Sequence, residues 1–97
     1  MDPDKQDISV SDVVVSTAGR DRGEWFYVID AEDSYVLLAN GKNRTLEQPK
    51  RKKIKHIEKV LRSETRVAAK LKAGNKVLNG ELRRDLASLS RDGKRTT

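Results

Sequence analysis

Two groups of basic side chains are the strongest candidates for chemistry in this sequence of 97 residues. In the first group, Arg20 and Arg22 flank Asp21 within the segment GRDRG, which begins at Gly19 and ends at Gly23. Guanidinium groups bind phosphate through forked, charge-assisted hydrogen bonds, and glycines permit the close approach of another backbone. We therefore predict that this segment contacts phosphate. The alternative is a solvated loop in which Asp21 compensates the two arginines.

The second group is a basic run that begins directly after Pro49. A run of this kind binds a phosphate backbone without sequence preference, and its affinity falls as the salt concentration rises. The alternative is a solvated, disordered linker. Lys42 and Arg44, which follow the Asn40-Gly41 pair, would extend the same surface. The candidate residues of the run are Lys50, Arg51, Lys52, Lys53 and Lys55.

Other kinds of site are not visible in the sequence. There is no cysteine, which excludes a disulfide framework and a cysteine-ligated zinc site. The single histidine, His56, lies beside isoleucines, and we expect it to be packed or at the surface because general acid–base catalysis needs a partnered group in a cleft. The GRDRG segment lacks the spacing and the Gly-Lys-Ser/Thr ending of a Walker motif. We predict a protein that is not an enzyme, with no catalytic residue, metal site, cofactor or small-molecule substrate.

The distribution of charge divides the chain. The net charge is +6, but residues 1–48 carry 5 basic and 10 acidic side chains, whereas residues 49–97 carry 16 basic and 5 acidic ones. This division predicts one mildly acidic body with a basic extension, for which a polyanion is the natural partner. No apolar run approaches the ~20 residues that span a membrane, and the acidic N-terminus lacks the apolar segment of a signal peptide. We expect a soluble cytoplasmic protein without membrane contact.

Short β-branched and aromatic segments, separated by turns, predict a small antiparallel sheet in the first half of the chain. A sheet of this size is stable mainly when it curls into a barrel-like form. Asn40-Gly41 predicts a type I′ hairpin turn, which needs positive φ at both central residues. Pro49 should end the last strand, because proline cannot donate to a strand ladder. The predicted strands cover residues 12–16, 24–31, 35–39 and 42–48.

Beyond the predicted sheet, the spacing of apolar residues favours helices. Residues 50–62 fit one face of a helix, although residues 54–56 would equally pair as a short closing strand. Residues 63–75 are a clearer helix, with Ser63 as N-cap and Gly74 at the C′ position.

A further helix is predicted over residues 79–93, with Asn79 as its N-cap. It carries a stripe of leucines at helical spacing. We expect this stripe to pack on the other helix or on the barrel. The alternative is a docking face for a protein partner, or a dimer seam, formed by Leu82, Leu86 and Leu89.

Three stretches, VVVSTAGRDRG, YVLLANGKNR and PKRKKIKHIE, resemble in this order the KOW-domain proteins, and Gly23 stands at the position of the motif's glycine. The chain is most similar to a bacterial group of KOW-domain RNA-binding proteins, which is itself similar to a KOW ribosomal protein of the large subunit in archaea and eukaryotes. The resemblance covers about residues 12–58 and implies a small SH3-like barrel. It differs from the usual pattern at Phe26, where other KOW strands have a second glycine. The domains implied are a flexible N-terminus (1–10), a KOW barrel (11–58) and a basic helical extension (59–97).

The resemblance also implies which aromatic side chains face the barrel interior. It places Val28 inside, and because side chains alternate along a strand, Phe26 is then inside and Trp25 and Tyr27 point outward. The two outward rings would form a platform for stacking unpaired bases, worth ~1–3 kcal/mol per base. The alternative is that the helical extension packs back on them.

These expectations leave two hypotheses for function. The first is an RNA-binding protein that binds structured ribosomal RNA or associates with the ribosome through its barrel and basic extension. The second is a protein-interaction module that docks on a transcription or translation factor. The predicted fold class for both is mostly β with an α-helical C-terminal extension, a small SH3-like KOW barrel followed by one or two helices.

Overall fold

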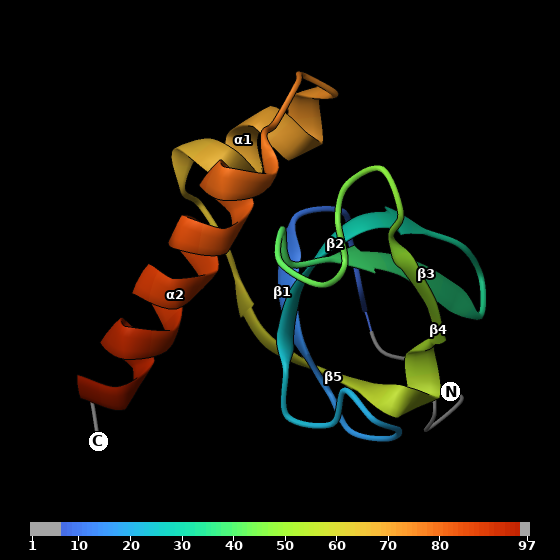
Figure 1. Ribbon diagram of the computed structural model, residues 1–97. Coiled ribbons are helices and arrows are strands. Elements are labelled where there is room, and N and C mark those ends of the chain that lie inside the picture. The colour runs from blue at the N-terminus through green and yellow to red at the C-terminus, as the bar shows by residue number, and fades with distance from the viewer. Residues whose placement is uncertain (1–6, 96–97) are drawn as a thin grey trace.

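Five strands form an antiparallel sheet in the computed structural model, which describes residues 7–95 (Figure 1). The sheet order is β4-β3-β2-β1-β5, and the sheet curls so that its two outer strands are joined by a short 3-10 turn, η1. Two helices follow, so the protein is mostly β with a helical C-terminal extension, as predicted. The elements are β1 (Asp12–Ser16), β2 (Trp25–Ala31), β3 (Tyr35–Ala39), β4 (Lys50–Lys53), η1 (Ile54–His56), β5 (Ile57–Arg62), α1 (Arg66–Ala73) and α2 (Asn79–Arg95).

An apolar core fills the inside of the curled sheet. Phe26 and Val28 of β2 both enter it and are fully buried, as the resemblance implied. Burying an aliphatic or aromatic side chain of this size contributes about 1.5–3 kcal/mol, so this cluster stabilises the curl. Its buried members are Val14, Phe26, Val28, Val36, Leu38, Ile54 and Ile57.

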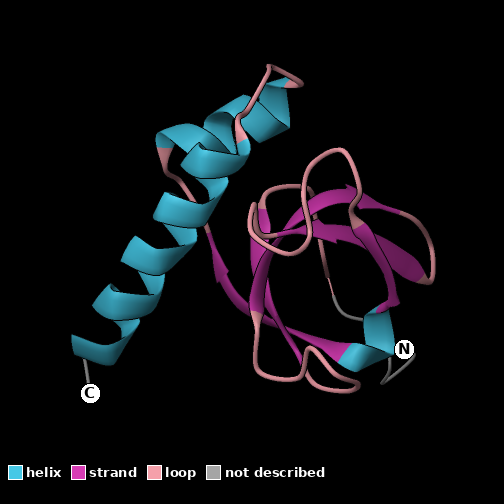
Figure 2. Cartoon of the chain, viewed as in Figure 1, coloured by secondary structure: helices cyan, strands magenta, loops and turns pink. Residues whose placement is uncertain are grey.

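A second core lies between the sheet and the two helices, which pack together on one side of it (Figure 2). The alternate residues of β1 and β2, Val13 and Tyr27, point out of the barrel and are covered there. Leu82 and Leu86 are buried in this core and Leu89 packs against it, so the expected packing of the leucine stripe is confirmed and the alternative of a docking face is wrong. The buried members are Val13, Tyr27, Ala39, Val67, Ala68, Val77, Leu82 and Leu86.

The predicted fourth strand is wrong, because residues 42–48 form a loop. Gly41 has a positive φ of 75°, but Asn40 does not, so the turn is not type I′. Instead, the Asn40 side-chain oxygen accepts hydrogen bonds from the backbone N–H groups of Lys42 and Arg44, at 3.0 and 3.1 Å. Asparagine stabilises many turns in this way, and here the bonds lead the chain away from β3 instead of back along it.

Residues 50–62 do not form the helix that their apolar spacing favours, and residues 54–56 form η1 and not the short closing strand that was the alternative. The residues form β4, η1 and β5, and β5 continues to Arg62, beyond the predicted end of the barrel at Glu58. The apolar spacing was ambiguous because Ile54 and Ile57 serve the barrel interior while Leu61 packs on the helix side. Alternate burial along β5 is the pattern of a strand.

The helix boundaries differ from the prediction at their N-termini. Thr65, and not Ser63, caps α1, and its hydroxyl accepts a hydrogen bond of 3.2 Å from the Ala68 N–H. Gly74 ends α1 in the left-handed conformation, as predicted. Asn79 is the first residue of α2, and its side-chain oxygen accepts a 2.8 Å hydrogen bond from the backbone of Leu46 in the loop.

Of the predicted flexible segment 1–10, residues 1–6 lie outside the described part of the chain. Ile8 packs against the barrel interior, and the Ser9 N–H donates a 2.9 Å hydrogen bond to Asp12. Within residues 7–95, no helix combines the length and the apolar character needed to cross a bilayer.

Candidate nucleic-acid interface

The GRDRG segment forms the loop between β1 and β2, and its backbone is held at both ends. Gly19 and Gly23 have φ values of 87° and 89°, which residues other than glycine rarely adopt. The Gly23 N–H donates to the Ser16 carbonyl at 2.8 Å, which closes the loop on itself. The Thr17 N–H donates to the carbonyl of His56 at 2.9 Å, which fixes the loop against η1.

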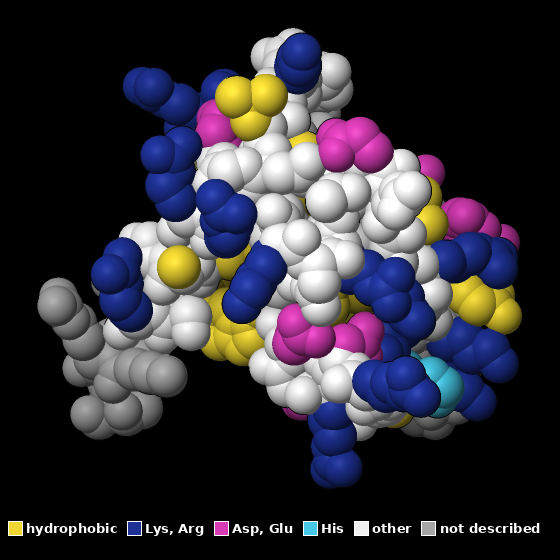
Figure 3. Space-filling view, viewed as in Figure 1, with side chains coloured by type: hydrophobic (Ala, Val, Ile, Leu, Met, Phe, Trp, Pro, Cys, Tyr) yellow, Lys and Arg dark blue, Asp and Glu magenta, His cyan; other side chains and the backbone are white. Residues whose placement is uncertain are grey.

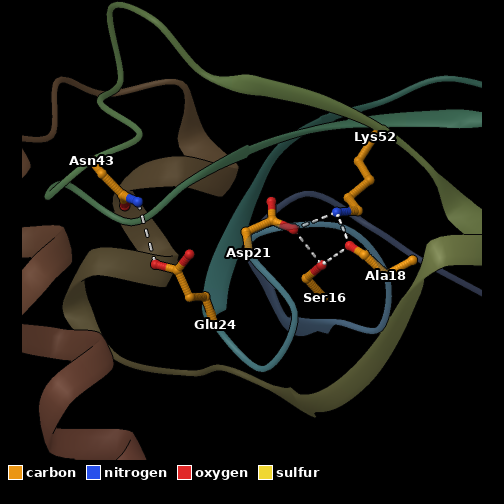
Figure 4. A network of polar contacts seen from close by, with 6 residues as sticks. All are labelled: Ser16, Ala18, Asp21, Glu24, Asn43 and Lys52. Carbon is orange, nitrogen blue, oxygen red and sulfur yellow. Dashed lines mark hydrogen bonds and ion pairs between the residues drawn. The ribbon is translucent and has the colours of Figure 1, made fainter.

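A buried ion pair joins this loop to β4. The Lys52 ammonium donates to Asp21 Oδ1 at 2.5 Å and to the Ala18 carbonyl at 2.7 Å, and the Ser16 hydroxyl donates to the same carboxylate oxygen at 2.7 Å (Figure 4). Lys52 and Asp21 are only 8% and 9% exposed. Charges buried in this way persist only when paired, so the contact acts as an internal clamp between loop and strand.

The clamp sets the ionisation of Asp21. Burial by itself raises the pKa of the carboxyl, but the hydrogen bonds from Lys52 and Ser16 and the charge of Lys52 outweigh it. The pKa of Asp21 therefore lies below its ordinary value, and the group is ionised at neutral pH. This carboxylate pairs with Lys52, and not with Arg20 and Arg22 as in the alternative of a solvated loop.

The same contact removes Lys52 from the candidate phosphate ligands. Its charge points inward and is paired with Asp21, so the prediction that it binds phosphate is wrong. The neighbours on β4 differ, because Arg51 and Lys53 are exposed and Lys50 is half-buried. Side chains alternate between the two faces of a strand, so Lys52 points inward while Arg51 and Lys53 point outward. This difference follows only if residues 50–53 are known to form a strand.

The loop and β4 together border two adjoining hollows. One, of about 250 Å³, lies among Gly19, Arg20, Asn43, Arg44 and Lys50, and the other, of about 410 Å³, lies along β4. The side chains around both include six basic and two acidic ones, which gives a net charge of +4 with the histidine neutral. We call this surface the basic face; its basic and acidic residues are Arg20, Asp21, Glu24, Arg44, Lys50, Arg51, Lys52, Lys53 and His56.

Most of the other predicted cations lie near the basic face. Arg22 is exposed on the same loop as Arg20, and Lys55 is exposed on η1 beside His56. Lys and Arg side chains gather around the histidine on this side of the molecule (Figure 3). Lys42 is exposed but borders a different hollow, on the side of α2.

The two aromatic residues predicted to stack bases have different environments. Tyr27 is fully buried beneath the helices, so the prediction that its ring stacks bases is wrong. Its hydroxyl donates to Asp85 and lies 2.8 Å from the Ser63 hydroxyl. Burial and the hydrogen bond to Asp85 raise the pKa of Tyr27 to about 12. Trp25 is half-buried and borders a hollow of about 190 Å³ with Lys42 and Arg83.

A third aromatic residue, Tyr35, belongs to the basic face and was not predicted from the sequence. It borders the larger hollow, and the guanidinium carbon of Arg51 lies 3.8 Å from the centre of its ring. Arg51 also pairs with Glu32 at 3.6 Å. The pairing of β3 with β4, which brings these residues together, was hidden because a strand was expected at residues 42–48.

Within residues 7–95, no group of three or more histidine, aspartate or glutamate side chains is arranged to hold a metal ion. Comparison with family models finds none that matches the chain, and comparison with curated proteins finds no match either.

Proposed function

We propose that this chain binds RNA through the basic face. The observation that carries the proposal is the Lys52–Asp21 clamp, which joins the GRDRG loop to β4 although 31 positions separate the two residues. Because the buried Lys52 ties the GRDRG loop to β4, the exposed cations of both segments are held around the same two hollows. Such an arrangement suits a phosphate backbone better than scattered surface charge does, because several phosphates are engaged at once.

The proposal extends to structured RNA of the ribosome. RNA helices are recognised mainly through shape, phosphates and 2′-hydroxyls, and a rigid cationic surface can provide these contacts without reading the sequence. The resemblance of residues 12–58 to KOW-domain RNA-binding proteins supports ribosomal RNA or the ribosome as the partner. The role is one of binding and not of catalysis. The alternative of a protein-docking module loses its main support, since the leucine stripe is buried.

A titration of a fluorescein-labelled RNA hairpin at several salt concentrations tests the proposal. The variant Lys50→Gln/Lys53→Gln removes two charges from the basic face and should weaken binding at low salt. For every phosphate that the variant no longer neutralises, the log–log salt slope should become shallower by roughly 0.7–0.9. The matched control Lys72→Gln/Lys76→Gln removes two exposed charges outside the basic face and should bind like the wild type.

A salt-independent affinity of the wild-type protein would contradict the proposal. So would an equal loss of affinity in the two double variants, because the basic face would then have no special role. For the ribosomal partner, co-sedimentation with ribosomes should be strong for the wild type and the control, and weak for the Lys50/Lys53 variant.

A further inference from the structure

We infer that the basic face contains a subsite for one unpaired nucleobase, formed by the guanidinium plane of Arg51 where it lies on the ring of Tyr35. This inference rests on the proposed RNA binding and makes it more specific. A surface that only bound phosphate would not distinguish paired from unpaired RNA. A flat stacking surface among the cations would distinguish unpaired from paired RNA, because an unpaired base exposes its faces and a paired base does not.

The plane of Arg51 is fixed from below and from one edge. Its guanidinium carbon lies 3.8 Å from the centroid of the Tyr35 ring, and one terminal nitrogen lies 3.6 Å from a Glu32 carboxylate oxygen. The side chain of Arg51 is nevertheless 56% exposed. A guanidinium whose central carbon lies over a ring at this distance stacks with one face on the ring, so we infer that its opposite face is the one that a base would reach.

Strand register explains why the stack exists. Tyr35 pairs with Lys53 across β3 and β4, and Leu37 pairs with Arg51, so Arg51 is the diagonal neighbour of Tyr35 on the same face of the sheet. Glu32 reaches Arg51 from the turn that precedes β3. The backbone N–H of Glu32 donates a 2.8 Å hydrogen bond to the Tyr35 carbonyl, which closes this turn. Backbone pairing therefore places Arg51 and Tyr35 side by side on one face of the sheet.

The surroundings suit a nucleotide. The adjoining hollow has a volume of about 410 Å³, within the ~300–1,000 Å³ typical of small-ligand pockets. Lys50, Lys53 and His56 border it and can accommodate the phosphates on either side of a stacked base. Glu32 lies 3.6 Å from one terminal nitrogen of the guanidinium and so compensates part of the charge of Arg51.

The test compares two RNA hairpins of equal length and charge, one fully paired and one with a single bulged 2-aminopurine. We expect the wild-type protein to bind the bulged hairpin about tenfold more tightly, in line with the contribution of one stacked base. The emission of the 2-aminopurine should change on binding. Arg51→Lys keeps the charge but removes the plane, so it should bind both hairpins equally, with the salt slope retained.

Two further variants control for the role of the stack. Tyr35→Phe keeps the ring and should keep the preference for the bulged hairpin. Arg84→Lys makes the same substitution at an exposed position of α2, outside the basic face, and should behave like the wild type.

The failure of the subsite can be distinguished from the failure of RNA binding. If Arg51→Lys retains the preference, or the wild type has none while both hairpins bind with a salt slope, the subsite is wrong and the proposed function stands. If neither hairpin binds, both are wrong. A bulged DNA hairpin bound as tightly as the RNA would overturn the assignment of the subsite to RNA.

Discussion

At the scale of single residues, the charge of Lys52 has a structural use that differs from that of its neighbours. The ammonium is enclosed by an Asp21 carboxylate oxygen and the Ala18 carbonyl, and the Ser16 hydroxyl satisfies the same carboxylate oxygen. Taking two charges out of water costs several kcal/mol for each ion, and their attraction and hydrogen bonds must offset that cost. Removing one partner is therefore far more damaging than removing both.

Asp21→Asn should lower the free energy of unfolding at neutral pH by about 3–5 kcal/mol, because it leaves the Lys52 ammonium buried without a counter-charge. The folded-state pKa of Asp21 is depressed, so its contribution to stability is fully present above the ordinary value of 3.8 and is lost as the pH falls through the folded-state pKa. The difference between wild type and variant should therefore shrink in acid. Urea denaturation between pH 7 and pH 3 measures it.

The double variant Asp21→Asn/Lys52→Met is the control for this prediction. It removes both charges and should recover much of the lost stability at pH 7. If Asp21→Asn were as stable as the wild type at pH 7, or if its deficit did not depend on pH, the clamp would not have the role assigned to it.

Residue types alone predicted which side chains are charged or aromatic, but not which are buried. The exposure of Arg20 and Arg22 followed from their place in a glycine-bounded loop. The sequence predicts Lys52 and Tyr27 at the surface, because nothing local separates a buried lysine or tyrosine from an exposed one. Their burial depends on contacts that are distant in sequence. Lys52 bonds to Asp21, 31 positions away, and Tyr27 bonds to Asp85 of α2, 58 positions away.

At the scale of elements, strong local signals predicted β1, β2, β3 and the left-handed end of α1 at Gly74. The prediction failed between residues 42 and 62, where β4 is short and entirely basic and a single 3-10 turn separates it from β5. Four consecutive basic residues have little intrinsic preference for a strand. β4 forms because β3 offers a pairing edge and Lys52 has a buried partner, and both are long-range effects.

The loop after β3 shows how one element positions another. A Cβ atom added to Gly41 would lie 2.1 Å from the Asn79 carbonyl oxygen and 3.1 Å from the Arg83 nitrogen, both in the first turns of α2. Glycine is needed here for its φ of 75° and also because the backbone of α2 passes directly over it.

Gly41→Ala should therefore disturb the docking of α2 as well as strain the loop. Gly74→Ala is a closely matched control, since Gly74 has a φ of 73° and no atom within 4 Å of an added Cβ. The control should cost only about 1–2 kcal/mol, the strain of a left-handed alanine. Gly41→Ala should cost clearly more in chemical denaturation. Equal losses would mean that α2 can shift away from the loop without penalty.

At the scale of the whole molecule, the helices and the basic face are separate regions. The radius of gyration is 12.5 Å, close to the ~13 Å of a compact chain of this length, so the helices pack on the barrel and do not extend from it. They cover one side of the sheet, whereas β4 and η1 lie on another (Figure 1). No residue of α1 or α2 is among those that border the two hollows of the basic face. The predicted basic extension thus has a structural role, in covering Tyr27, that its charge did not indicate.

This separation predicts that stability and RNA binding can be changed independently. Leu82→Ala creates a cavity between α2 and the sheet and should lower the free energy of unfolding by about 2–5 kcal/mol. RNA affinity, measured at a temperature where the variant stays folded, should remain within about twofold of the wild type. Leu38→Ala is the matched comparison, because Leu38 is equally buried but lies on β3 opposite Lys50. It should be destabilised by a similar amount and should also bind RNA more weakly, since β3 supports the strand that carries the cations. If Leu82→Ala lost affinity in proportion to its stability, the helices would belong to the RNA-binding surface.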